Sequence, residues 1–260
     1  MIDTHCHILP MCDDGPTDWN QALEMAKEAV SEGITDVIAT PHHGKGRYYN
    51  RTDKIASMVG RMNTLLSAEK VPLAVWAGQE YHYSANARKG PDFQALQPLN
   101  SSGYVLIELP SKSTPRHWRD FVQALRNSGY QPVIAHPERH LPFVQEPGNM
   151  YEWIVAGAYF QLTAPSINGL YGREARKAAF RMAHNGWIHL LASDAHDTDA
   201  RPLRLQKAYE TLDSMLGQPL VGMLQDNARR LLQGEMLHCS ETVVPAETRR
   251  GPIGFLRRNR

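Results

Sequence analysis

Short apolar runs alternate with amphipathic segments along most of the chain. The amphipathic segments repeat apolar residues every three or four positions, the spacing of one helix face, whereas the short runs are rich in Val, Ile and Leu. Strands are therefore expected at residues 2–7, 36–40, 72–77, 104–108, 131–135, 158–162 and 188–192. Helices are expected at about 17–33 with Thr17 as the N-cap, 52–69, 114–127, 149–156, 173–185, 202–215 and 219–232, with a loop at 163–172.

This order of elements predicts parallel βα units. So many units in a chain of this length favour a closed or nearly closed (β/α) barrel, with a doubly wound open sheet as the alternative. The pattern fails from about Cys239, where Pro, Gly and five arginines follow. We expect a barrel domain at residues 1–239 and a flexible basic tail at 240–260.

Composition narrows the class of protein. The chain has 260 residues and a net charge of +1, so no overall field selects nucleic acid or a membrane surface. Its three cysteines form no paired framework, and the first residues do not resemble a signal peptide, which favours the cytoplasm. No apolar run approaches the roughly 20 residues of a membrane helix. The one excess is in histidine, with 12 residues.

Six of the seven expected strands end in a histidine or an acid. Because the carboxyl ends of parallel strands share one face of a barrel, we expect these side chains to converge there. On the first strand, alternation places His5 and His7 on one face and Cys6 on the other. The residues at the strand ends are His5, His7, His42, Glu80, Glu108, His136, Asp194 and His196.

Imidazole and carboxylate groups without a cysteine cluster suit Zn²⁺, Mn²⁺ or Fe²⁺. Together with Asp14, these groups are too many for one ion, and they fit two or three ions that share a carboxylate. A salt-bridged cluster is the alternative, but it needs Lys or Arg at the strand ends, and only Arg139 is adjacent in sequence.

Four segments carry a resemblance to a known family. They are His-x-His-Ile-Leu-Pro-x-x-Asp-Asp-Gly-Pro at 5–16, Ala-Thr-Pro-His-His at 39–43, His-Pro-Glu-Arg at 136–139 and Ala-Ser-Asp-Ala-His at 192–196. Over residues 1–235 the chain resembles the polymerase-and-histidinol-phosphatase (PHP) superfamily. Within it, the chain resembles the bacterial manganese-dependent tyrosine phosphatases of capsule and exopolysaccharide operons.

The resemblance implies a distorted (β/α)7 TIM-like barrel with the metal site at the strand ends. It implies three ligand sets, in which Glu80 bridges two ions. These sets are His5, His7, Glu80 and Asp194; Glu80, Glu108 and His136; and Asp14, His42 and His196. It also implies two or three divalent ions, with manganese expected and Fe or Zn as alternatives.

Further residues are candidates for substrate contact. Arg139 is the expected phosphate clamp, because a planar guanidinium matches two phosphate oxygens. His43 and His140 adjoin ligand positions and could contact substrate or move a proton. Arg47, Tyr48, Arg201 and Arg204 could line the substrate mouth or simply form exposed loops and surface ion pairs.

The expected function is phosphotyrosine hydrolysis in a protein, by attack of a metal-bound hydroxide on phosphorus. By resemblance, the substrate is the tail of a bacterial tyrosine kinase that controls capsule or exopolysaccharide synthesis. A histidinol-phosphate phosphatase is the second hypothesis. A nuclease, disfavoured by the near-neutral charge, and a non-catalytic metal-binding protein are the others.

Overall fold

The strands of the computed structural model, which describes residues 1–84 and 91–240, are all parallel. One sheet has the order β1-β2-β4, formed by Ile2–Cys6, Asp36–Ala39 and Ala74–Ala77. The other has the order β3-β5-β6-β7-β8-β9, formed by His42–His43, Glu80–His82, Tyr104–Glu108, Gln131–Ala135, Tyr159–Thr163 and Leu190–Ala192. The prediction of a parallel α/β fold is confirmed. The arginine-rich part of the expected tail, 241–260, lies outside the described residues.

The two sheets meet at two places. At the first, the central strand β2 of the smaller sheet continues into β3 across Thr40 and Pro41, and β4 continues into β5 across Gly78 and Gln79. Because proline has no N–H to donate, the hydrogen-bond ladder between β2 and β4 is interrupted near Pro41. The short strands β3 and β5 form a separate pair beyond it. At each of these continuations the sequence pattern predicted a single strand, at 36–40 and at 72–77, whereas the structure has two. Strands of two or three residues are too short to show a periodicity in the sequence.

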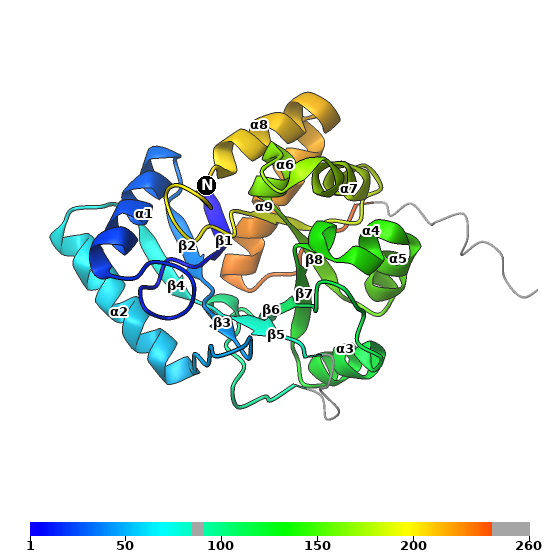
Figure 1. Ribbon diagram of the computed structural model, residues 1–260, viewed down its shortest axis with the longest axis horizontal. Helices are drawn as coiled ribbons and strands as arrows, with labels where there is room; N and C mark the ends of the chain where they lie inside the picture. The colour runs from blue at the N-terminus through cyan, green and yellow to red at the C-terminus, as the bar shows by residue number, and fades with distance from the viewer. Residues whose placement is uncertain (85–90, 241–260) are drawn as a thin grey trace, which may run out of the picture.

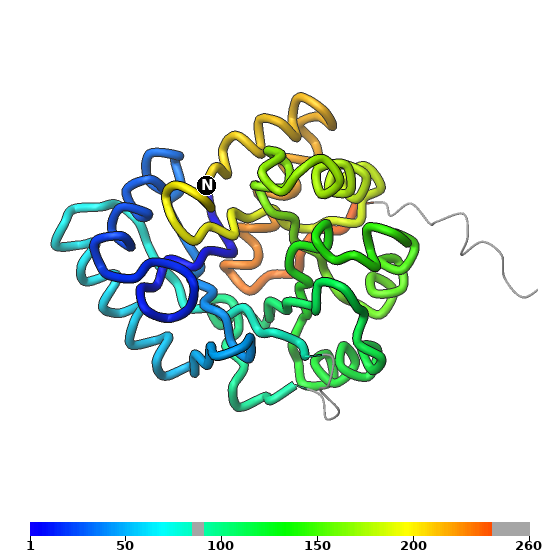
Figure 2. Tube along the Cα trace, viewed as in Figure 1, coloured from blue at the N-terminus to red at the C-terminus, as the bar shows by residue number. Residues whose placement is uncertain are grey.

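At the second, the edge strand β1 meets the segment that follows the edge strand β9. The amide of Asp194 donates to the carbonyl of His5 at 2.9 Å, and the amide of His7 donates to the carbonyl of Ala195 at 2.8 Å. In Figure 2 the N-terminal loop in dark blue and the loop after β9 in yellow accordingly lie side by side. The described pairings form two sheets with neighbouring edges and not one closed ring of seven strands.

Helices surround the strands on most sides (Figure 1). They are α1 (Trp19–Ser31), α2 (Thr52–Ala68), α3 (Trp118–Asn127), α4 (Leu141–Gln145), α5 (Gly148–Val155), α6 (Ala164–Asn168), α7 (Gly172–His184), α8 (Leu205–Leu216) and α9 (Gln218–Gln233), with short 3-10 turns η1 (Leu99–Ser101) and η2 (Pro137–Arg139). Within residues 1–84 and 91–240, none of the helices combines the length and the apolar character that crossing a bilayer requires.

Some predicted helix limits are wrong. The first helix is capped by Asp18 and not by Thr17, because the Asp18 carboxylate accepts from the amides of Asn20 and Gln21 at 2.8 and 2.9 Å. The third helix begins at Trp118, later than the expected start near residue 114. Helix α6 occupies part of a segment that was expected to be a loop, and it starts directly after β8.

Apolar side chains cover both faces of the strands, which explains the nearly continuous apolar runs. On β6, Val105 and Ile107 pack into the larger core with the outer helices, whereas Tyr104 and Leu106 pack into a second cluster. That second cluster also contains Ile38 of the three-stranded sheet and Leu231 of α9. Helix α9 therefore lies against residues from both sheets, and the two sheets share one interior.

Gly78 provides a test of the junction between β4 and β5. A Cβ at this buried position would lie 2.6 Å from Cγ2 of Ile38, 2.9 Å from Cδ2 of Leu99 and 3.1 Å from the carbonyl of Ala39. We expect Gly78→Ala to lower the free energy of unfolding by roughly 1–3 kcal/mol through overpacking. Urea denaturation of purified protein measures this change.

Gly60 is the matched control, because it is exposed in the interior of α2 and a Cβ there would meet nothing within 4 Å. Gly60→Ala should raise stability by roughly 0.5–1 kcal/mol through helix propensity. Equal effects of the two substitutions would contradict the close packing at the junction.

Candidate metal centre

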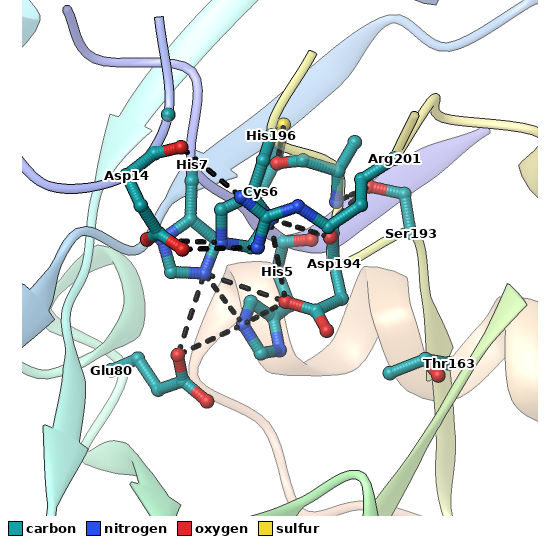
Figure 3. Close-up of polar contacts among 12 residues, drawn as sticks. His5, Cys6, His7, Asp14, Glu80, Thr163, Ser193, Asp194, His196 and Arg201 are labelled. Atoms are coloured by element: carbon teal, nitrogen blue, oxygen red, sulfur yellow. Dashed lines mark hydrogen bonds and ion pairs between the residues drawn. The ribbon is translucent and has the colours of Figure 1, made fainter. Parts of the chain in front are cut away.

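The end of β1, the start of β5 and the segment after β9 bring four metal-ligating side chains together. His5 and His7 point to the same side of β1, with their Nε2 atoms 3.2 Å apart, while Cys6 is buried in the larger core (Figure 3). The Nε2 atom of His5 lies 3.5 Å from Glu80 Oε2 and 3.3 Å from Asp194 Oδ1, and that of His7 lies 3.4 and 3.5 Å from the same two oxygens. The predicted alternation on the first strand is confirmed.

These spacings match those of a coordination sphere. Donor atoms at the corners of a tetrahedron with metal bonds of about 2.1 Å lie roughly 3.4 Å apart. Five of the six distances among the four donors lie between 3.2 and 3.5 Å, and the ligand atoms of all four residues lie within 4.8 Å of one another. The four side chains are also fully or almost fully buried.

A second group lies beside the first and shares His7 with it. Asp14 Oδ1 is 3.5 Å from His42 Nε2 and 3.4 Å from His196 Nε2, and the ring of His196 stacks on that of His7 with centroids 3.8 Å apart. The ligand atoms of His7, Asp14, His42 and His196 all lie within 4.8 Å of one another.

A third group surrounds Glu80 on its other side. His42 Nδ1 is 2.7 Å from Glu80 Oε2, and His136 Nε2 is 2.9 Å from Glu80 Oε1. Both imidazoles lie 3.9 Å from an oxygen of Glu108. The three residues whose ligand atoms all lie within 4.8 Å of one another are His42, Glu80 and Glu108. The family resemblance instead implied His136 as the third member of this set. All nine predicted ligand residues thus belong to one connected cluster.

Unpaired polar atoms indicate that this cluster is incomplete without cations. Glu80 Oε2 and His196 Nε2 are buried and make no hydrogen bond of good geometry, and their nearest polar neighbours are other ligand candidates, His42 Nδ1 at 2.7 Å from Glu80 Oε2 and Asp14 Oδ1 at 3.4 Å from His196 Nε2. A buried polar atom without a partner costs about 1–3 kcal/mol, more when it is charged. The residues therefore fit a centre of divalent ions, which would bind Glu80 Oε2 and His196 Nε2.

Neighbouring groups orient the imidazoles toward the cluster. His7 Nδ1 donates to Asp13 Oδ2 at 2.6 Å, and His5 Nδ1 donates to Gln161 Oε1 at 2.8 Å. Because Nδ1 carries the proton, each Nε2 presents a free lone pair to the cluster. Gln161 was missed, although a polar residue within the apolar run of β8 was a signal.

The electrostatics of the cluster favour ionised carboxylates. Burial disfavours the charged form of Glu80, but the imidazoles of His42 and His5 hold its pKa well below the usual range. Burial likewise opposes ionisation of Asp194, and His5 and His7 hold its pKa well below its usual range. Despite its burial, the pKa of His7 is raised by Asp13.

Three cations from three loops lie at the rim, and each contacts one carboxylate. Arg139 Nη1 is 2.6 Å from Asp194 Oδ2, Lys45 Nζ is 2.6 Å from Glu108 Oε1, and Arg201 Nη1 is 3.0 Å from Asp14 Oδ2. A salt-bridged cluster would also need a lysine or arginine at Glu80. In the described parts of the chain, the ion pairs of Glu80 are with imidazoles.

Three more candidates lie near the mouth of the centre. The ring of Tyr48 stacks on His42 with centroids 6.1 Å apart, and the guanidinium of Arg47 lies 5.5 Å from the centre of the Tyr48 ring. His140 lines a cavity of about 80 Å³ together with His136 and Arg139.

Other candidates have partners outside the cluster. His43 is buried and its Nδ1 donates to the carbonyl of Asn50 at 2.9 Å, where it supports the loop before α2. Arg204 is paired with Glu28 of α1 at 3.8 Å. The structure does not bring these two residues to the metal-ligand groups.

A parallel α/β fold with histidine and carboxylate groups at the strand ends defines a class of metallohydrolase-like proteins. The chain belongs to the CpsB/CapC family of capsular polysaccharide synthesis, whose family model matches residues 1–233. The family resemblance read from the sequence is thereby confirmed.

Two curated relatives and one solved structure agree with this family assignment. The chain is 37% identical to the tyrosine-protein phosphatase YwqE of Bacillus subtilis, over 91% of this chain and 93% of that protein. It is 36% identical to the putative tyrosine-protein phosphatase CapC of Staphylococcus aureus, over 83% and 88%. A crystal structure from work on YwqE and on CpsB of Streptococcus pneumoniae, described as unique metal-dependent tyrosine phosphatases, matches with a TM-score of 0.89 and 36% identity over 94% of this chain and 98% of that chain.

More distant structures share the fold alone. A phosphotriesterase homology protein from Escherichia coli matches with a TM-score of 0.51 at 13% identity, over 88% of this chain and 97% of that chain.

Gln161 provides a test of how the centre is oriented. Gln161→Leu keeps the size of the side chain but removes the acceptor for His5 Nδ1, so the imidazole is free to rotate or to change its tautomer. We expect the affinity for Mn²⁺ to fall roughly 10–100-fold, the usual effect of losing such a partner. Calorimetric titration of metal-free protein measures it, with Gln123→Leu on the surface of α3 as the control. An unchanged affinity would remove Gln161 from this role.

Proposed function

We propose that this protein is a metal-dependent phosphatase that hydrolyses phosphotyrosine in proteins. The observation that carries the proposal is the set of four buried donors at coordination-like spacing, next to cations that can receive a phosphoryl group. The relatives described as tyrosine phosphatases support the choice of substrate.

Three ligand sets would hold the ions. His5, His7, Glu80 and Asp194 would hold the first, and Glu80, Glu108 and His136 the second, with His42 beside it. Asp14, His42 and His196 would hold the third. We propose manganese, with Fe and Zn as alternatives, because the donors are imidazole and carboxylate only. When bound, such ions make water nucleophilic at neutral pH and neutralise charge on phosphoryl oxygens.

Arg139 would orient the phosphoryl group. Its guanidinium is held between the Asp194 carboxylate and the ring of Tyr171, whose centre lies 4.5 Å away. The planar fork presents two N–H groups to two phosphoryl oxygens, which stabilises the charge of an in-line displacement. Arg201, across the site on Asp14, is the second candidate for this contact.

The leaving group matters because the site offers little acid assistance. His140 is a poor donor, since its Nε2 donates to the carbonyl of Ser113 at 3.2 Å and burial lowers its pKa to about 4. A phenolate with a pKa near 10 leaves with less protonation than an alkoxide. This chemistry favours phosphotyrosine over the alkyl ester histidinol phosphate, which remains the second candidate.

The remaining assignments are proposals of the same kind. The two sheets with neighbouring edges would act as one distorted (β/α)7 barrel within a domain at residues 1–239. The partner would be a phosphotyrosyl protein such as a bacterial tyrosine kinase of capsule or exopolysaccharide synthesis, and the free cysteines suit the cytoplasm.

A panel of substrates tests the activity. Protein treated with a chelator should not hydrolyse a phosphotyrosyl peptide, and Mn²⁺ should restore hydrolysis, at a kcat/KM well above that for histidinol phosphate. Released phosphate is measured for both substrates. Absence of Mn²⁺-dependent hydrolysis would exclude the enzyme, and a preference for histidinol phosphate would select the second candidate.

His136 tests the ligand assignment. Its imidazole contacts Glu80 and lies near Glu108, so His136→Ala should lower kcat by roughly two orders of magnitude or more through loss of a ligand. His117→Ala is the control, because His117 is exposed and pairs with Asp120 on the surface. Wild-type rates in the His136 variant, with the fold verified by circular dichroism, would remove it from the site.

A further inference from the structure

Lys45 contacts two donor atoms of the candidate metal centre at once. Its ammonium lies 2.6 Å from Glu108 Oε1 and 3.1 Å from His42 Nε2. Arg139 and Arg201, the other two rim cations, form ion pairs only with carboxylates of the centre. Lys45 is thus the one rim cation among the described residues that is within hydrogen-bond distance of an imidazole ligand.

The loop that carries Lys45 has a defined backbone. The amide of Gly44 donates to the carbonyl of Tyr48 at 2.8 Å, and the amide of Tyr48 donates to the carbonyl of Lys45 at 3.0 Å. The side chain of Lys45 is 39% exposed, so it approaches the centre from the solvent side. Its flexible four-carbon stem allows the ammonium to move while the turn stays in place.

The contact with His42 excludes a metal ion at the same atom. A neutral imidazole nitrogen has one lone pair, and a lysine ammonium can only donate to it. A divalent ion at His42 Nε2 needs that same lone pair. The ammonium and the ion also compete for Glu108 Oε1, and two cations at this distance repel each other.

We propose that Lys45 is a displaceable counter-ion, which occupies Glu108 and His42 in the metal-free protein and contacts the substrate phosphoryl group once ions are bound. The inference rests on the proposed function. It adds that Lys45 contacts first the ligands Glu108 and His42 and then, after metal binding, the substrate phosphoryl group. The second partner follows from position and charge, because a phosphate monoester dianion would enter from the side on which Lys45 is exposed. Lys45, Arg139 and Arg201 would then surround that dianion from three loops.

The proposal predicts two effects of opposite sign. Lys45→Met removes the competing charge and keeps the apolar stem, so metal-free protein should bind Mn²⁺ more tightly, by roughly three- to tenfold. The same variant, loaded with Mn²⁺, should bind inorganic phosphate roughly tenfold more weakly and show a raised KM for a phosphotyrosyl peptide. Lys45→Arg keeps the charge and should restore phosphate binding.

Calorimetric titration of the 260-residue chain measures both affinities, first with Mn²⁺ and then with inorganic phosphate. Lys27→Met is the matched control, because Lys27 pairs with Glu24 on the surface at 2.8 Å and should change neither affinity. The melting temperature of the metal-free Lys45→Met protein should also fall, because Glu108 loses its cation, and Mn²⁺ should restore it.

Two results would overturn the inference. One is a Mn²⁺ affinity of Lys45→Met that is unchanged or weaker, and the other is an unchanged phosphate affinity. Failure of the proposed function is distinguishable, because in that case the wild-type protein itself would bind no Mn²⁺ or hydrolyse no phosphotyrosyl peptide.

Discussion

The close packing of four carboxylates and five imidazoles is the constraint on which the rest of the site depends. Asp14, Glu80, Glu108 and Asp194 lie at one end of the parallel strands, and Glu80 is fully buried among them. Like charges at such distances repel strongly in a medium of low dielectric constant. The rim cations contact three of the four carboxylates and leave Glu80 to imidazoles, so positive charge is required at the centre of the cluster.

The backbone is adapted to bring these side chains together. His136 and Asp194 both have positive φ values, 35° and 53°, at the ends of β7 and β9. Such conformations cost about 1–3 kcal/mol for residues other than glycine, and they persist where the surroundings impose them. Both residues belong to the cluster, so at these two positions a strained backbone aims a ligand inward.

The sequence predicted the parts of the structure that depend on local spacing. His5 and His7 share a face because strand side chains alternate, and the other ligands meet because the ends of parallel strands lie together. Contacts between distant segments were not predictable in this way. Neither the pairing of Lys45 with Glu108 nor that of Arg201 with Asp14 has a local signal, since both depend on how loops cross the rim. The short strands β3 and β5 were missed because their register is set by their neighbours.

The central claim is that buried donors from separate strands enclose divalent ions. Anomalous X-ray scattering from crystals grown with Mn²⁺, recorded on both sides of the manganese absorption edge, tests it directly. The account predicts one peak among His5, His7, Glu80 and Asp194 and at least one more on the other side of Glu80. Density maps with the cluster intact and no anomalous peak within coordination distance of these atoms would contradict it.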